Sequence, residues 1–164
     1  MVKGSCRLDL KIKRTDENEV PKLLEIQKES FAEDLKRYND QDSSPVNEPM
    51  ERLLRKTQVF LHYTIWLNGE IIGGIDIRDL NNNRYRLNRI FLSNNQQNKG
   101  YGTHIMELIE SEFPLAKEWS LDTPHLNTRN HHFYEKLGYK KISEHQVTDT
   151  LTLFDYVKKN MLVC

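Results

Sequence analysis

The chain has 164 residues, the length of one ordinary domain. Its 24 Lys and Arg residues balance its 24 Asp and Glu residues, which excludes a globally basic nucleic-acid binder and an acidic disordered chain. No apolar run approaches the roughly 18–20 residues of a membrane span, and the first residues lack the apolar segment of a secretory signal. Cys6 and Cys164 lie at opposite ends, as expected for reduced thiols. We therefore expect a cytoplasmic protein that binds neither nucleic acid nor membranes.

The first half of the chain passes from a helical to an alternating hydrophobic pattern. Residues 7–14 alternate as a half-buried strand does, and Asp16 or Asn18 can cap a helix that carries Pro21 in its first turn. Asn68-Gly69 is a strong hairpin signal. The remaining expected elements are a polar loop at 39–49, a short helix at 51–56, and strands at 59–67, 71–77 and 85–92.

In the second half, helices and strands alternate. The expected order is a glycine-containing loop, a helix ending near 113–114, a strand at 119–121, a helix at 130–137, and strands near 139–142 and 151–157. Gly138 follows the second of these helices, where a left-handed C-cap is common. This order predicts an α/β protein with a mixed sheet.

The segment 87–103 joins an expected strand to a helix through a loop that contains Gly100 and Gly102. Such a loop presents unpaired backbone N–H groups at the positive end of a helix dipole, and glycine lets a pyrophosphate approach the backbone. The spacing fits neither a Walker loop nor a dinucleotide-binding fingerprint. Taken alone, the segment is equally consistent with an ordinary strand–helix connection.

A second segment, 127–139, follows a short strand at a fixed distance. The pattern Gln97-x-x-Gly100-x-Gly102, followed by Asn127 and then Phe133-Tyr134-Glu135-Lys136-Leu137-Gly138-Tyr139, closely resembles the two signature motifs of the GCN5-related N-acetyltransferases, the GNAT family. The resemblance in element order covers roughly residues 6–158. It implies a single domain over residues 1–164 with a mixed, mostly antiparallel sheet of about six to seven strands, flanked by about four helices and splayed between the fourth and fifth strands.

The resemblance also implies acetyl-CoA as co-substrate, bound between the two splayed strands. The backbone of Ile90, Phe91 and Leu92 would pair with the pantetheine arm, and an N–H near Phe91, freed by a bulge, would polarise the thioester carbonyl. The residues implied to cradle the pyrophosphate are Gln97, Asn98, Lys99, Gly100, Tyr101, Gly102 and Thr103. Asn127 matches the family's pantetheine-contacting asparagine. Asn130 departs from the pattern, which usually has a small apolar residue there, and either contacts the cofactor or faces solvent.

Tyr134 matches the family's tyrosine that protonates the departing CoA thiolate. The alternative is a core tyrosine, because Phe133 and Leu137 beside it are expected in the core. The acceptor amine must also lose a proton, because an alkyl ammonium has a pKa near 10.4. Asp122, at the end of a strand, is the main candidate for this base, and a turn-capping aspartate is the alternative. Weaker candidates are Glu33, Asp34, His62 and Asp76.

The histidines do not form a recognisable metal-binding pattern. His131 and His132 are adjacent on a helix and point in different directions, and His125 precedes a turn. We therefore expect no metal. The acceptor site is expected around the first helix and the 39–49 loop, where Glu33, Asp34, Tyr38, Asp42 and Glu48 suit a cationic amine.

The predicted function is direct transfer of an acetyl group to a primary amine, on a small molecule or a peptide, in a ternary complex without a covalent enzyme intermediate. Two alternatives stay open: a non-catalytic acyl-CoA-binding regulatory module, and an enzyme that uses another acyl-CoA. The sequence leaves the acceptor and the oligomeric state open, a homodimer included. Residues 78–100 carry five basic side chains against one acidic, a local charge of +4, which predicts a basic seam facing the CoA phosphates.

Overall fold

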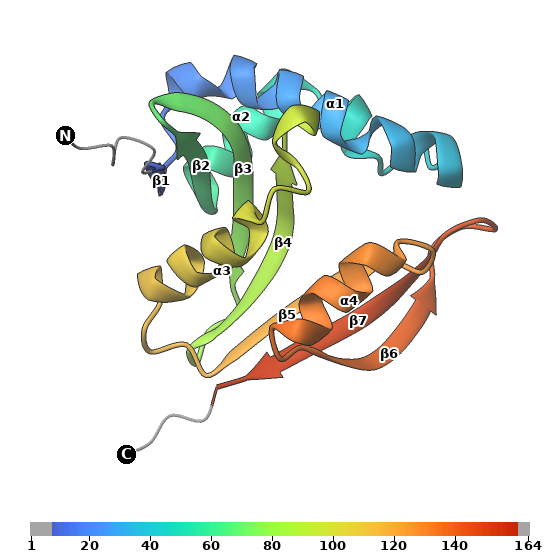
Figure 1. The fold of residues 1–164 in the computed structure, drawn as a ribbon. Helices are drawn as coiled ribbons and strands as arrows, with labels where there is room; N and C mark the ends of the chain where they lie inside the picture. The colour runs from blue at the N-terminus through green and yellow to red at the C-terminus, as the bar shows by residue number, and fades with distance from the viewer. Residues whose placement is uncertain (1–7, 161–164) are drawn as a thin grey trace.

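The computed structural model describes residues 8–160, which form one seven-stranded sheet with four α-helices (Figure 1). The strands are β1 (Leu10–Arg14), β2 (Leu61–Leu67), β3 (Glu70–Asp79), β4 (Arg84–Leu92), β5 (Glu118–Pro124), β6 (Lys140–Gln146) and β7 (Thr152–Lys159). The helices are α1 (Val20–Tyr38), α2 (Met50–Val59), α3 (Tyr101–Glu112) and α4 (Thr128–Lys136). Short 3-10 turns, η2 (Glu17–Glu19), η3 (Pro45–Asn47) and η4 (Asn94–Gln96), complete the chain. Cys6 and Cys164 lie outside the described residues.

The sheet order is β1-β2-β3-β4-β5-β7-β6, and the pairing is antiparallel except between β4 and β5. The β4–β5 ladder is parallel and short, with Arg84 opposite Glu118, Tyr85 opposite Trp119 and Arg86 opposite Ser120. Beyond that point the two strands diverge, and the sheet opens into two arms (Figure 1). The predicted mixed sheet, splayed between its fourth and fifth strands, is confirmed.

The two faces of the first arm carry separate hydrophobic cores. Phe91 packs with α1 and α2 residues such as Leu23 and Leu53. Ile90 and Leu92, its neighbours on β4, pack against the other cluster, which contains the apolar residues of α3. This separation follows from the alternation of side chains along a strand. In the second arm, α4 lies along β5 and β7 (Figure 1), with the His131 ring stacked on Phe154 at 5.0 Å between centroids.

Several element boundaries differ from those that the hydrophobic pattern predicts. The short second helix runs over Met50–Val59 and not 51–56, so the following strand begins at Leu61. The strand expected at 119–121 extends over Glu118–Pro124, and the one expected at 139–142 runs over Lys140–Gln146. Every residue of β6 is exposed, which leaves no apolar alternation from which its length could be inferred.

The expected hairpin at Asn68-Gly69 is confirmed. Asn68 has a φ of 51° and Gly69 a φ of 85°, the conformation of a type I′ turn, which joins β2 to β3. Gly138, at a φ of 100°, ends α4 as predicted. Over the described range, no helix combines the length and the apolar character that crossing a membrane requires.

Candidate active site

A cavity of about 250 Å³ lies where β4 and β5 diverge. Its walls come from residues 87–90 of β4, residues 121–124 of β5, and the C-terminal half of α1. Asn127, Asn130 and Tyr134 close it from the side of α4. The cavity therefore brings together segments nearly a hundred residues apart in sequence.

One edge of this opening is the free edge of β4. The N–H of Ser93 donates to the carbonyl of Ile72 on β3 at 2.8 Å. In an antiparallel ladder, alternate residues direct their N–H and C=O groups to the same neighbouring strand. The backbone of Phe91 therefore faces β3, and the backbone groups of Ile90 and Leu92 face the opening. The side chain of Gln97 donates to the outward carbonyl of Leu92 at 2.9 Å, consistent with this orientation.

The bulge in β4 lies elsewhere than expected. Asp76 pairs with Arg89 and Ile77 with Leu87, so Asn88 is the extra residue, and Phe91 pairs regularly with Gly74. The expectation of a bulge that frees an N–H near Phe91 is therefore wrong in position. The amides that the ladder directs into the opening are those of Ile90 and Leu92.

The glycine loop ends at the N-terminus of α3. Gly100 is the N-cap, with a φ of 84° that favours glycine. The first-turn amides that follow it have no partner within the helix, so they form an anion-binding end. A Cβ atom on Gly102 would lie 3.0 Å from the ring of Phe133, so this glycine also allows α3 to pack against α4. Arg129 donates from α4 to the side chain of Asn98 in the loop.

Asn127 fastens the end of α1 to the start of α4. Its Oδ1 accepts hydrogen bonds from the Tyr38 hydroxyl at 2.7 Å and from Arg37 at 3.1 Å. Its amide donates to both carboxylate oxygens of Asp34 at 3.3 Å. Burial raises the pKa of Asp34. The amide of Asn130 donates to the Thr123 hydroxyl at 3.4 Å, so Asn130 contributes to the cavity wall although it is also exposed to solvent.

Tyr134 is 8% exposed and lines the cavity. Burial, with a smaller contribution from Asp122, raises the pKa of its hydroxyl to about 12. Among the described residues, no protein group forms a hydrogen bond with that hydroxyl, and its ring packs edge-on against Tyr139. The hydroxyl thus keeps its proton at neutral pH and is available to donate it.

Asp122 lies beside the point where the strands part. It is two residues past Ser120, the last β5 residue that pairs with β4. Its carboxylate accepts a 2.7 Å hydrogen bond from the guanidinium of Arg86. Of the weaker base candidates, Asp34 lines the cavity, whereas Glu33, His62 and Asp76 do not. Burial lowers the pKa of His62 to about 4, and its ring bonds to Thr15 at 2.7 Å.

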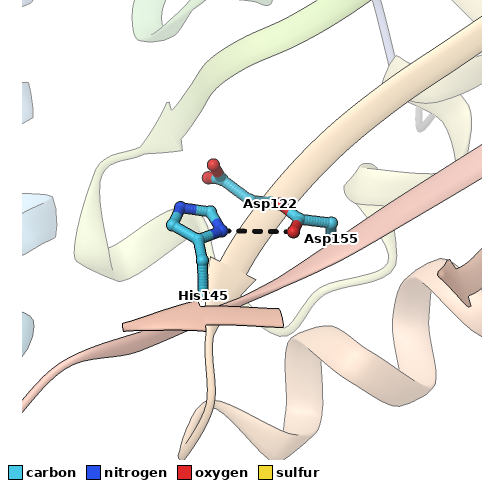
Figure 2. A group of neighbouring side chains, drawn as sticks. All are labelled: Asp122, His145 and Asp155. Atoms are coloured by element: carbon cyan, nitrogen blue, oxygen red, sulfur yellow. Dashed lines mark hydrogen bonds and ion pairs between the residues drawn. The ribbon is translucent and has the colours of Figure 1, made fainter. Parts of the chain in front are cut away.

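Two residues near Asp122 were not predicted from the sequence. Figure 2 shows Asp122, His145 and Asp155, on the three neighbouring strands β5, β6 and β7, with His145 Nδ1 bonded to Asp155 Oδ2 at 3.1 Å. One polar atom from each lies within 4.8 Å of the others, as a metal site requires. The carboxylate of Asp122 already pairs with Arg86, and that of Asp155 with His145, so both carboxylates have protein partners.

His131 and His125 have structural partners. His131 Nε2 bonds to the carbonyl of Pro124 at 3.0 Å, and His125 Nδ1 bonds to the backbone of Thr152. Neither lies in the group shown in Figure 2.

The four arginines of the expected basic seam over residues 78–100 are bound to other protein groups. Arg78 pairs with Asp76, Arg86 with Asp122 and Arg89 with Glu48, all at 3.0 Å or less. Arg84 donates to backbone carbonyls of the β3–β4 turn. Much of the local charge of +4 is therefore neutralised by carboxylates outside residues 78–100.

Glu48 is buried and unavailable to an acceptor. It pairs with Lys56 and Arg89 and accepts a hydrogen bond from Gln27 at 3.0 Å. These partners lower the pKa of Glu48, although burial alone would raise it. Asp34 and Tyr38, by contrast, line the cavity as expected for an acceptor site.

Comparisons with known proteins agree with this geometry. A family model described as the acetyltransferase (GNAT) family matches residues 20–139. The chain is 27% identical over 160 residues to an uncharacterised N-acetyltransferase in the pepI 3′ region of Lactobacillus delbrueckii subsp. lactis, an alignment that covers 83% of this chain and 87% of that protein.

Solved structures share the fold. The PaiA N-acetyltransferase from Thermoplasma acidophilum, solved in complex with coenzyme A, has a TM-score of 0.74 at 18% identity over 93% of this chain and 99% of its own. The ribosomal-protein-S18-alanine N-acetyltransferase from Escherichia coli has a TM-score of 0.76 at 13% identity over 95% of this chain and 97% of its own.

Proposed function

Because the chain belongs to the GNAT acetyltransferase family, we propose that it is a single-domain N-acetyltransferase that moves the acetyl group of acetyl-CoA to a primary amine. Acetyl-CoA supplies the acetyl group as an activated thioester. The observation that carries the proposal is Tyr134, a buried tyrosine with a protonated, unpartnered hydroxyl on the wall of a cavity between diverging strands.

The binding residues that we propose for acetyl-CoA follow the opening. The outward amides of Ile90 and Leu92 would pair with the pantetheine arm and hold the carbonyl oxygen of the thioester. The loop from Gln97 to Thr103 would hold the pyrophosphate through its backbone amides at the N-terminus of α3. Asn130 and Asn127 lie between these two regions on the α4 side.

In the transfer step, Tyr134 would give its proton to the CoA thiolate as the carbon–sulfur bond breaks. Asp122 would face the acceptor amine from the β5 side of the cavity. The two cysteines of the chain, Cys6 and Cys164, have no matched histidine in the sequence, so we propose direct attack by the amine and not an acyl-enzyme formed on a thiol.

The acceptor is proposed to be cationic before it reacts. Asp34 and Asp40 line the cavity, and within residues 8–160 neither carboxylate forms an ion pair. Two unpaired carboxylates attract an ammonium ion to the side of α1.

A CoA-release assay over polyamines, amino acids, aminoglycosides and peptide N-termini tests the proposal. We expect turnover with at least one amine. Binding of acetyl-CoA without release on any amine would instead favour a regulatory acyl-CoA-binding module. Faster release from a longer acyl-CoA would assign a different acyl group.

A further inference from the structure

The group formed by Asp122, His145 and Asp155 lies beside the cavity, and only Asp122 has a role in the steps above. Asp122 lines the cavity directly. Leu153 also lines it and pairs with His145 across the β6–β7 ladder. His145 therefore flanks the cavity on the sheet face that carries Asp122, across β7 from it (Figure 2).

The carboxylate of Asp122 is already engaged by a cation. The guanidinium of Arg86 lies 2.7 Å from it, as a hydrogen bond and an ion pair. A role of Asp122 as the base would therefore compete with this ion pair. The acceptor amine nevertheless has to be neutral before it can attack the thioester.

His145 has the arrangement of an oriented imidazole base. Asp155 lies 3.1 Å from Nδ1 and is itself held by a 2.8 Å hydrogen bond from the Ser143 hydroxyl. When Nδ1–H donates this hydrogen bond to Asp155, the lone pair of the neutral ring lies on Nε2. The side chain of His145 is 51% exposed, so a proton that it receives can pass to water.

The charged surroundings of His145 favour this role. Asp155 on β7 and Asp122 on β5 face it, with Arg86 on β4 behind Asp122. On its own strand, Lys141 and Glu144 pair with each other at 3.3 Å. The nearest charged groups around the imidazole are thus two carboxylates.

We propose that His145 takes the proton of the acceptor ammonium, while Asp122 holds that ammonium and Asp155 positions the imidazole ring. This inference rests on the proposed N-acetyltransferase function. The N–H bond of the ammonium breaks, its electron pair stays on the amine nitrogen, and a new N–H bond forms at Nε2. A carboxylate oxygen of Asp122 and a ring nitrogen of His145 lie within 4.8 Å of each other, so one ammonium ion could contact both residues.

The test is the pH dependence of kcat/KM in His145→Gln, measured by CoA release with an amine that the wild-type protein accepts. At pH 7 we expect a loss of about 10²-fold, at the lower end of general base catalysis. The wild-type value should level off once the base is deprotonated. The variant value should rise about tenfold per pH unit toward pH 10, as the amine loses its own proton.

Three further variants sharpen the result. Asp155→Asn should show the same change of profile with a smaller loss, which a purely structural role would not produce. His145→Ala should regain activity when imidazole is added. His132→Gln, which changes an exposed histidine of α4, should keep the wild-type profile.

The outcomes separate the two proposals. If the wild-type protein binds acetyl-CoA but acetylates no amine, the proposed function fails, and this inference fails with it. If the wild-type protein is active and His145→Gln keeps its pH profile, or imidazole gives His145→Ala no activity, only the role of His145 is overturned. Thermal stabilisation by acetyl-CoA verifies that each variant is folded.

Discussion

The two arms of the sheet differ in how deeply they bury particular charged side chains. In the first arm, charged and polar groups are buried and satisfied by one another: Glu48, His62 and Asp76 are each at most 5% exposed and have protein partners. In the second arm, Asp122, His145 and Asp155 are partly exposed beside the cavity. A buried network fixes a structure, whereas half-exposed groups near a cavity can exchange protons with a substrate and with water.

From this contrast we expect the first arm to contribute mainly to the stability of the fold and the second arm to contribute mainly to catalysis. Substitutions in the two arms should therefore separate: those in the second arm should change turnover, and those in the first should change the free energy of unfolding. Three predictions, beyond the His145 test, examine this separation.

The largest effect is expected for Tyr134→Phe, which removes the proposed acid and keeps the ring packing. We expect kcat to fall by about 10²–10⁴-fold with little change in acetyl-CoA affinity. Steady-state kinetics and calorimetric binding measure the two quantities. Tyr139→Phe is the matched control, because the Tyr139 hydroxyl is buried without a partner among the described residues, and its removal should leave kcat unchanged. Equal kcat in wild type and Tyr134→Phe would refute the acid role.

The second prediction concerns His62 in the first arm. Burial lowers the pKa of His62 from 6.5 to about 4. Between these two pH values, the unfolded chain binds a proton at His62 and the folded protein does not. Stability is therefore lost as the pH falls from about 6.5 to about 4, by about 3 kcal/mol.

Urea unfolding at several pH values measures this loss. His62→Gln should flatten the dependence over that window, whereas the exposed His132→Gln should keep it. An unchanged slope in His62→Gln would show that other groups govern the acid sensitivity.

The smallest of the three effects is expected at Gly102, in the first turn of α3. Gly102→Asp places a negative charge at the proposed pyrophosphate site and should weaken acetyl-CoA binding by roughly tenfold or more. Gly102→Ala is the control, since its Cβ meets the Phe133 ring in the same way but adds no charge. Thermal shift with acetyl-CoA compares them, and similar shifts in both variants would contradict the assignment of the loop.

Local sequence signals predicted much of the fold. The Asn68-Gly69 turn, the C-cap at Gly138 and the splayed fourth and fifth strands are all present, because turn residues and the two family motifs fix them locally. The motifs also directed attention to Tyr134, which lines the cavity.

The missed residues depend on contacts between strands that are distant in sequence. His145 lies on a strand whose residues are all exposed, so no hydrophobic period revealed that the strand continues past residue 142. Arg86 was recognised as basic, but its partner Asp122 is 36 residues away in sequence and is brought near by the parallel pairing of β4 and β5. Arg89 likewise pairs with Glu48 from a distant segment, whereas the partner of Arg78 is Asp76 on the same strand.

The open edge of β4 also bears on how the protein avoids association with other chains. An unpaired strand edge is a template on which a second polypeptide can add, and many proteins protect such edges with charge or by covering them. Here the edge formed by Ile90 and Leu92 faces inward between two arms of one sheet, and the side chain of Gln97 already occupies the Leu92 carbonyl. To pair with these amides, a second polypeptide would have to enter between the two arms. The edge is therefore covered by the protein's own second arm, and charged edge residues are not its only means of protection.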